Sequence, residues 1–271
     1  MSVLEDILAS TRVELEQRKR ERPEAQVREQ ARAVRDTGRG LRDALSTPGV
    51  SVIAEFKRRS PSAGRLREDA DLGETVKAYE RGGASAVSVL TEGPNFEGSL
   101  DDLLDARAAC GLPVLRKDFI VDPYQLYEAR LAGADAVLLI VAALSASELG
   151  ALRERARELS LDVLVEVHDS DELRVALGAG ADLIGINNRD LRDFSVDVER
   201  TFALMDEMPA GVLAVSESGI ASPAQLARLD EAGVAAVLVG ESLMRAPRPE
   251  QALHKLRAYS AGSPISEPTA R

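Results

Sequence analysis

The chain has 271 residues, of which 45% are hydrophobic, so it can bury a core and wholesale disorder is excluded. A net charge of −11 argues against a nucleic-acid groove, and no apolar run approaches the length of a membrane span. The single cysteine, Cys110, excludes an intramolecular disulfide, and no Cys/His spacing resembles a zinc site. We therefore expect a soluble cytoplasmic protein that binds neither nucleic acid nor membrane.

The first segment, residues 3–35, carries apolar side chains at helical spacing with dense charge between them. This pattern predicts one or two amphipathic helices, interrupted near Pro23. The charged N-terminus has no apolar core of signal-peptide length, which fits the cytoplasmic expectation. The last ten residues, 262–271, are rich in Ser and Pro and are expected to fray.

Between these ends, strand-like and helix-like stretches alternate regularly. The strand-like runs lie near residues 51–57, 86–90, 113–117, 135–141, 162–167, 182–187, 212–216 and 235–239. The helical stretches lie near residues 71–81, 99–109, 123–132, 145–159, 170–178, 197–207, 222–231 and 250–260. This count and length predict an α/β fold, a (β/α)₈ TIM barrel over 49–261 with an N-terminal helical extension, 1–48, packed on it. A doubly wound sheet is the alternative, but it lacks a dinucleotide fingerprint here.

Five of the apolar runs end in a charged or amide side chain. The runs are 53–57, 113–117, 164–166, 184–187 and 213–217. Strand side chains alternate between faces, so a charged residue two positions after an apolar, barrel-facing residue points into the same lumen. Parity therefore predicts that Glu55, Lys57, Lys117, Glu166 and Glu217 meet at the barrel mouth, where they can supply general acids and bases.

Two glycine-containing loops indicate a phosphate site. Residues 216–220 follow the seventh strand, and residues 239–242 follow the eighth into a helix start. Loops at these positions in a barrel commonly bind phosphate through backbone N–H groups, although each glycine is also explained by a simple turn. Residues 56–64 add three cations in a long loop, which suits a mobile lid. Leu138 and Ile140 share a strand face, and Phe96, Phe119 and Leu191 in loops can wall a ring-shaped substrate.

The motifs at these strand ends resemble the indole-3-glycerol-phosphate synthase family of tryptophan biosynthesis over residues 50–246. They read IAEFKRRSPS at 53–62, LTE at 90–92 with Phe96 and 98–99, LPVLRKDFI at 112–120, VEVH at 165–168, GINNRDL at 185–191, SESGI at 216–220 and LVGESLM at 238–244. The N-terminal extension is also similar to that of the family. The resemblance implies a single-barrel, monofunctional lyase that closes the ring of 1-(2-carboxyphenylamino)-1-deoxyribulose 5-phosphate, with loss of CO₂ and water.

The resemblance also implies roles for individual residues. Lys117 is expected as general acid, Glu55 and Glu166 as stabilisers of a cationic intermediate, and Glu166 as proton acceptor. Lys57 and Lys117 both remain candidates for the donor in dehydration. Asn187 and Arg189 are expected to hold polar parts of the substrate, and Ser60 to lie near its carboxylate. The phosphate is expected at Ser218, Gly219 and Gly240, and the aromatic ring between Pro61, Phe96, Phe119 and Leu191. Further residues expected in the site are Glu217, Leu238 and Glu241. Many relatives have Ser where this chain has Glu241, so we expect a phosphate contact there through the backbone N–H rather than through a side-chain hydroxyl.

Two other functions remain open from the residues. A phosphoribosyl isomerase would use the same phosphate cradle, but it typically needs Asp or Cys as acid and base rather than Lys and Glu. A non-catalytic ligand-binding barrel is disfavoured because Glu55, Lys57, Lys117 and Glu166 are all present. We expect no cofactor and no metal, a phosphorylated small-molecule substrate, and a monomer, with a weak homodimer as the alternative.

Overall fold

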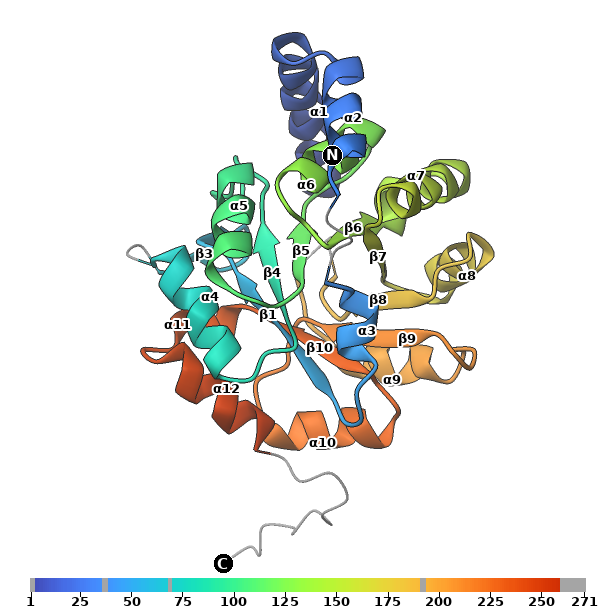
Figure 1. Ribbon diagram of the computed structural model, residues 1–271. Helices are drawn as coiled ribbons and strands as arrows, with labels where there is room; N and C mark the ends of the chain where they lie inside the picture. The colour runs from blue at the N-terminus through green and yellow to red at the C-terminus, as the bar shows by residue number, and fades with distance from the viewer. Residues whose placement is uncertain (1–2, 36–38, 68–69, 191–193, 259–271) are drawn as a thin grey trace, which may run out of the picture.

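The described strands of the computed structural model close into a parallel barrel (Figure 1). The structure describes residues 3–35, 39–67, 70–190 and 194–258. The barrel strands are β1 (Ser51–Phe56), β4 (Ala86–Leu90), β5 (Val114–Lys117), β6 (Ala136–Ile140), β7 (Asp162–Val167), β8 (Leu183–Asn187), β9 (Leu213–Glu217) and β10 (Ala236–Val239). They pair in chain order, and β1 closes the barrel by pairing with both β4 and β10. The predicted (β/α)₈ barrel is therefore confirmed.

Helices follow the strands and cover the outside of the barrel. They are α4 (Leu72–Arg81), α5 (Leu100–Ala109), α6 (Pro123–Leu131), α7 (Ala146–Glu158), α8 (Ser170–Gly178), α9 (Glu199–Met205), α10 (Pro223–Glu231) and α12 (Pro249–Arg257). Side-chain caps start most of them, since Asp71, Ser99, Asp122, Ser145, Asp169 and Ser222 each accept a hydrogen bond from a first-turn N–H. The predicted helices agree with these within two residues at each end, except that the last one, predicted to end at residue 260, ends at Arg257.

The N-terminal segment forms α1 (Val3–Glu21) and α2 (Glu24–Ala33), which separate at Pro23 as the sequence predicts. Helix α1 is tied to α6 by two ion pairs, Arg18 to Glu128 at 2.9 Å and Lys19 to Asp122 at 2.7 Å. Both pairs bridge parts of the chain about a hundred residues apart, so they fix the extension against the barrel wall. The predicted frayed tail, residues 262–271, lies outside the described residues.

Four short elements were not predicted from the sequence. Helix α3 (Leu41–Leu45) precedes β1, and its two buried leucines pack into the barrel interior. The segment after β1, expected as a long loop, contains the antiparallel pair β2 (Arg59–Ser60) and β3 (Gly64–Arg65). A single 3₁₀ turn, Val141–Ala143, follows β6. The expected helix start after β10 is present as α11 (Glu241–Arg245).

The buried side chains form two clusters that follow strand parity. The outer cluster joins the strands to the helices and contains residues such as Val52, Val87 and Val165. The inner cluster fills the barrel, and it comprises Leu41, Leu45, Ile53, Ala86, Leu115, Ala136, Leu138, Ile140, Leu164, Leu183, Val215, Ala236 and Leu238. A filled interior leaves space for a ligand only above the strand ends. Within the described ranges, no helix is both long and apolar enough to cross a bilayer.

Candidate active site

The charged strand ends converge above the inner cluster, as parity predicts. Ile53, Leu115, Leu164 and Val215 belong to that cluster, and the residues two positions further along their strands are Glu55, Lys117, Glu166 and Glu217. These three glutamates are 3%, 2% and 1% exposed. Buried charges of this kind are stable only when they are paired, so their partners determine the chemistry of the site.

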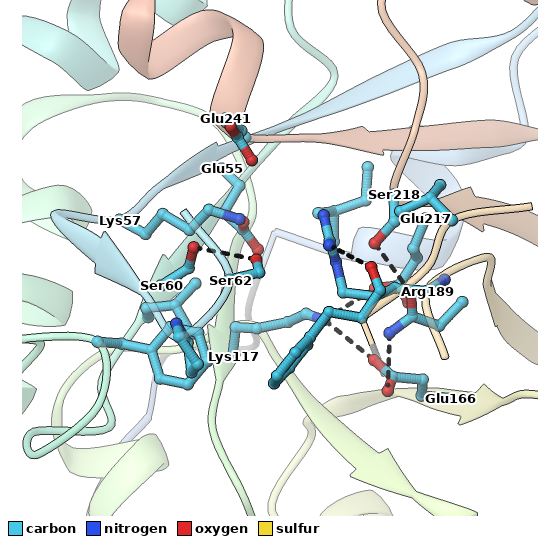
Figure 2. Close-up of a pocket in the computed structure, with 18 of the residues that line it drawn as sticks. Glu55, Lys57, Ser60, Ser62, Lys117, Glu166, Arg189, Glu217, Ser218 and Glu241 are labelled. Carbon is cyan, nitrogen blue, oxygen red and sulfur yellow. Dashed lines mark hydrogen bonds and ion pairs between the residues drawn. The ribbon is translucent and has the colours of Figure 1, made fainter. Parts of the chain in front are cut away.

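A cavity of about 480 Å³ opens at this end of the barrel (Figure 2). Figure 2 shows Lys57, Ser60 and Ser62 on one side of it and Glu166, Arg189 and Ser218 on the other. The cavity brings together the predicted site residues Glu55, Lys57, Ser60, Pro61, Phe96, Lys117, Phe119, Glu166, Asn187, Arg189, Glu217, Ser218, Gly219, Leu238, Gly240 and Glu241. The remaining predicted residue, Leu191, lies outside the described residues.

Lys117 is the centre of the charge network. Its ammonium lies 3.0 Å from Oε2 of Glu166 and 2.8 Å from Oε2 of Glu217. Burial lowers the pKa of Lys117, but the surrounding carboxylates of Glu166, Glu217 and Glu55 outweigh this effect and raise it above its usual value. Lys117 is therefore protonated at neutral pH and can act as an acid.

The two carboxylates that share Lys117 differ in their ionisation. Burial raises the pKa of both, and Lys117 opposes that effect in both. Glu166 also faces His168 and accepts a hydrogen bond from Asn187, so its pKa falls below its usual value. For Glu217, burial together with repulsion from Glu166 and Glu55 outweighs the effect of Lys117, and its pKa rises to about 7. One ammonium thus holds one firmly ionised carboxylate and one that titrates near neutral pH.

Replacing Glu217 with Gln should change how stability depends on pH. The pKa of Glu217 is raised on folding, so the folded chain binds the proton more tightly than the unfolded chain does. This contribution to stability is present below the unfolded pKa of about 4.5 and is lost as pH rises through about 7. We expect the free energy of unfolding of Glu217→Gln, relative to wild type, to rise by about 1–3 kcal/mol between pH 5 and pH 8. Urea denaturation at the two pH values measures this, and a constant difference would contradict it.

A second ion pair lies beside the first. The Lys57 ammonium lies 2.7 Å from Oε1 of Glu55. The two cations that follow Lys57 turn away, since Arg58 binds Asp102 through two hydrogen bonds and Arg59 lies 3.8 Å from Glu97. Of these three consecutive cations, only Lys57 lines the cavity.

Asn187 links the charge network to the loops after β8 and β9. Its amide donates to Oε1 of Glu166 at 3.2 Å, and its oxygen accepts from the Ser218 hydroxyl at 2.9 Å and from the backbone N–H of Arg189 at 3.1 Å. The Arg189 guanidinium donates to the carbonyl of Phe194. These bonds fix the Asn187 side chain, so it can orient both Glu166 and a bound ligand.

An apolar wall faces the charges across the cavity. Phe96 and Phe119 lie with ring centroids 6.2 Å apart, and Leu138 and Ile140 line the floor. Several further lining residues were not predicted from the sequence, namely Val3, Leu4 and Ile7 of α1 and Phe194 and Val196 after β8. The apolar stripe of α1 was visible in the sequence, but the surface that it would cover was not.

The far end of the cavity is built from backbone. Ser218 and Gly219 have φ values of 65° and 84°, which turns the chain sharply after β9. At Gly240, a side chain would meet Glu55, so the β10 backbone approaches that carboxylate closely. The Glu241 carboxylate accepts from Arg245 Nε at 3.1 Å, one turn along α11. Any anion contact of Glu241 must therefore use its backbone N–H rather than its charged side chain.

In the part of the chain that the structure describes, no three His, Cys, Asp or Glu side chains are grouped so that they could hold a metal ion. The polar groups of the cavity are instead ammoniums, guanidiniums, carboxylates, amides and hydroxyls. They can transfer protons, stabilise opposite charges and bind an anion.

Comparison with known proteins identifies the family. Residues 4–256 match the family model described as indole-3-glycerol phosphate synthase. Indole-3-glycerol phosphate synthase 2 of Streptomyces coelicolor is 51% identical, over 91% of this chain and 95% of its own length. The Micrococcus luteus indole-3-glycerol phosphate synthase is 48% identical, over 96% of this chain and 98% of its own length.

Solved structures show the same fold at lower identity. A thiamine phosphate pyrophosphorylase from Pyrococcus furiosus has a TM-score of 0.60 at 19% identity, covering 80% of this chain and 96% of its own. A mutant tryptophan synthase alpha-subunit from the same organism has a TM-score of 0.59 at 13% identity, covering 76% and 97%. These two likenesses establish the barrel alone, whereas the family match and the curated relatives cover nearly the whole sequence. The chain belongs to the indole-3-glycerol phosphate synthase family.

Proposed function

We propose that the cavity above the barrel converts 1-(2-carboxyphenylamino)-1-deoxyribulose 5-phosphate to indole-3-glycerol phosphate, with Lys117 as the acid that starts ring closure. As a member of its family, the chain is a carboxy-lyase of tryptophan biosynthesis that acts on a phosphorylated small molecule. The observation that carries the residue assignment is the buried ammonium of Lys117, held between Glu166 and Glu217. It lies in a cavity that also has an apolar wall and a backbone-lined anion end.

Ring closure needs a polarised carbonyl group as the electrophile and negative charge nearby to stabilise a cationic intermediate. Lys117 donates a proton to the sugar carbonyl oxygen while the aromatic carbon that bears the carboxylate attacks the carbonyl carbon. This step forms the new C–C bond, a hydroxyl group and an iminium-like cation on the ring nitrogen. The buried carboxylates of Glu55 and Glu166 stabilise that cation because charges interact strongly where water is excluded.

Loss of CO₂ and of water then completes the indole. The C–CO₂⁻ bond breaks, and its electron pair returns to the ring and neutralises the iminium. The hydroxyl leaves as water after it receives a proton from Lys57 or Lys117. A base takes a proton from the ring CH₂ next to the nitrogen, so that the C=C bond of the indole forms and the N–H is kept. Glu166 is suited to be that base because its pKa is held below the usual value, so it is ionised when the proton arrives.

The rest of the cavity positions the substrate. The N–H groups around Ser218, Gly219 and Gly240 receive the phosphate, and the Phe96–Phe119 wall packs on the aromatic ring. Ser60 lies beside the substrate carboxylate, and Asn187 and Arg189 contact its hydroxyls. The Ser60 hydroxyl already accepts from the Ala63 N–H, which holds it towards the cavity.

Turnover of the carboxyphenylamino substrate tests this function directly. We expect the purified protein to release a product with indole fluorescence, at the same rate with and without a chelator. Mass balance should show the loss of one CO₂ and one water. No turnover, or isomerisation of a phosphoribosyl substrate instead, would contradict the proposal.

We further place the protein in the cytoplasm, as a monomer. Gel filtration across a concentration series distinguishes the monomer from a weak homodimer.

A further inference from the structure

His168 lies directly after β7, two residues beyond Glu166, and is not part of the cavity lining. Its side chain is only 12% exposed. The ring Nε2 lies 3.5 Å from Oε1 of Glu166, and it has no hydrogen-bond partner in the part of the chain that the structure describes. The imidazole thus lies next to the proposed base without lining the cavity itself.

Glu172 holds the imidazole in this orientation. Its Oε2 accepts from the backbone N–H of His168 at 2.8 Å and lies 3.0 Å from the ring Nδ1. Glu172 is in the first turn of α8, whose start is fixed by the Asp169 cap. With Nδ1 bonded to a carboxylate, the second nitrogen is directed at Glu166, and a protonated ring places an N–H there.

The charges of the site explain why an imidazolium fits this position. Among the described residues, the three buried carboxylates of Glu55, Glu166 and Glu217 share two lysine ammoniums as ion-pair partners, Lys57 on Glu55 and Lys117 on the other two. Burial alone would lower the pKa of His168, but Glu172, Glu166 and Glu217 outweigh it and raise the pKa above its usual value. These three carboxylates, from α8, β7 and β9, face the ring, and Lys117 contacts the last two.

We propose that His168 is a positioning residue for Glu166: as an imidazolium anchored by Glu172, it keeps the Glu166 carboxylate ionised and correctly oriented as the base. The inference rests on the role proposed above for Glu166. It assigns to His168 no contact with the substrate. It also accounts for the unequal ionisation of the two carboxylates that share Lys117, because, among the described residues, Glu166 is the one of the two whose carboxylate lies within ion-pair distance of the ring, 3.5 Å from Nε2.

The pH profile of kcat/KM tests this role. His168→Gln keeps an amide that can donate to Glu166 but removes the charge, so protonation of Glu166 becomes easier. We expect the acid side of the kcat/KM profile to shift to higher pH by about one unit, while KM changes little. At high pH, kcat/KM of the variant should approach that of the wild type. Glu172→Gln, which leaves the ring but removes its anchor, should shift the acid side in the same direction. The proposal would be overturned if the acid side of the His168→Gln profile did not shift, or if kcat fell by the same factor at every pH.

A direct titration separates this proposal from the proposed function, because it does not need turnover. The chain has two histidines, so a His254→Gln variant leaves His168 as the single imidazole signal in nitrogen-detected NMR. We expect this signal to titrate above about 6.5, the ordinary value for histidine, and to titrate lower once Glu166→Gln is added. Titration at or below 6.5, or no response to Glu166→Gln, would refute the imidazolium even if the enzyme turns over normally.

Discussion

Replacing Lys117 with Met is expected to lower kcat by about a thousandfold while the fold is retained, because the general acid is lost together with the charge that polarises the carbonyl. Met has nearly the same length as Lys and fills the same space. The change also leaves Glu166 and Glu217 together in a buried site without an ammonium, so one of them must take up a proton. Steady-state kcat and KM at pH 7, with circular dichroism to check folding, measure the effect.

Lys77→Met is the matched control. Lys77 also contacts a glutamate, with its ammonium 3.0 Å from Glu74, but the pair lies on the surface of α4. Exposed pairs contribute little, so kcat and stability should barely change. If Lys117→Met retained kcat, the acid role would be wrong. A raised KM with normal kcat would make Lys117 a binding group instead.

The barrel could be predicted from sequence because its signals are local. Strand runs, helix periods and capping residues such as Ser145 and Ser222 each lie within a few positions of the element that they define. The convergence of Glu55, Lys117 and Glu166 was predictable too, because strand parity and closure together leave one place for them.

What the sequence could not provide depends on contacts between distant segments. The apolar face of α1 predicts burial but not that Val3 and Ile7 wall the cavity. Helix α3 is only five residues long, and its position follows from the space that Leu41 and Leu45 fill inside the barrel. The ionisation of Glu217 likewise depends on which donors reach it in space. Glu166 lies two residues before His168 in the sequence, but spacing alone does not show that its carboxylate comes within 3.5 Å of the ring.

Replacing Gly185 with Ala is expected to lower kcat/KM by about 10- to 100-fold although residue 185 carries no side chain that reacts. Gly185 faces the lumen from the middle of β8, and an added Cβ would overlap Oε1 of Glu217 and lie 3.4 Å from a methyl group of Leu164. That oxygen of Glu217 is buried and has no hydrogen-bond partner among the described residues, so nothing else holds it in place. The carboxylate must therefore rotate away from Lys117, and a misplacement of about 1 Å in a charge network can cost about a hundredfold in rate.

Gly150→Ala tests whether the loss comes from the displaced carboxylate rather than from the substitution itself. Gly150 lies within α7, and a Cβ there meets nothing within 4 Å. The same chemical change should leave kcat/KM unaltered and stabilise the protein by about 0.5–1 kcal/mol, because Ala favours helix more than Gly does. Thermal unfolding should show a destabilisation of about 1–3 kcal/mol for Gly185→Ala from overpacking. If Gly185→Ala were as active as Gly150→Ala, Glu217 would not need its present position, and the charge network would reduce to Lys117 and Glu166.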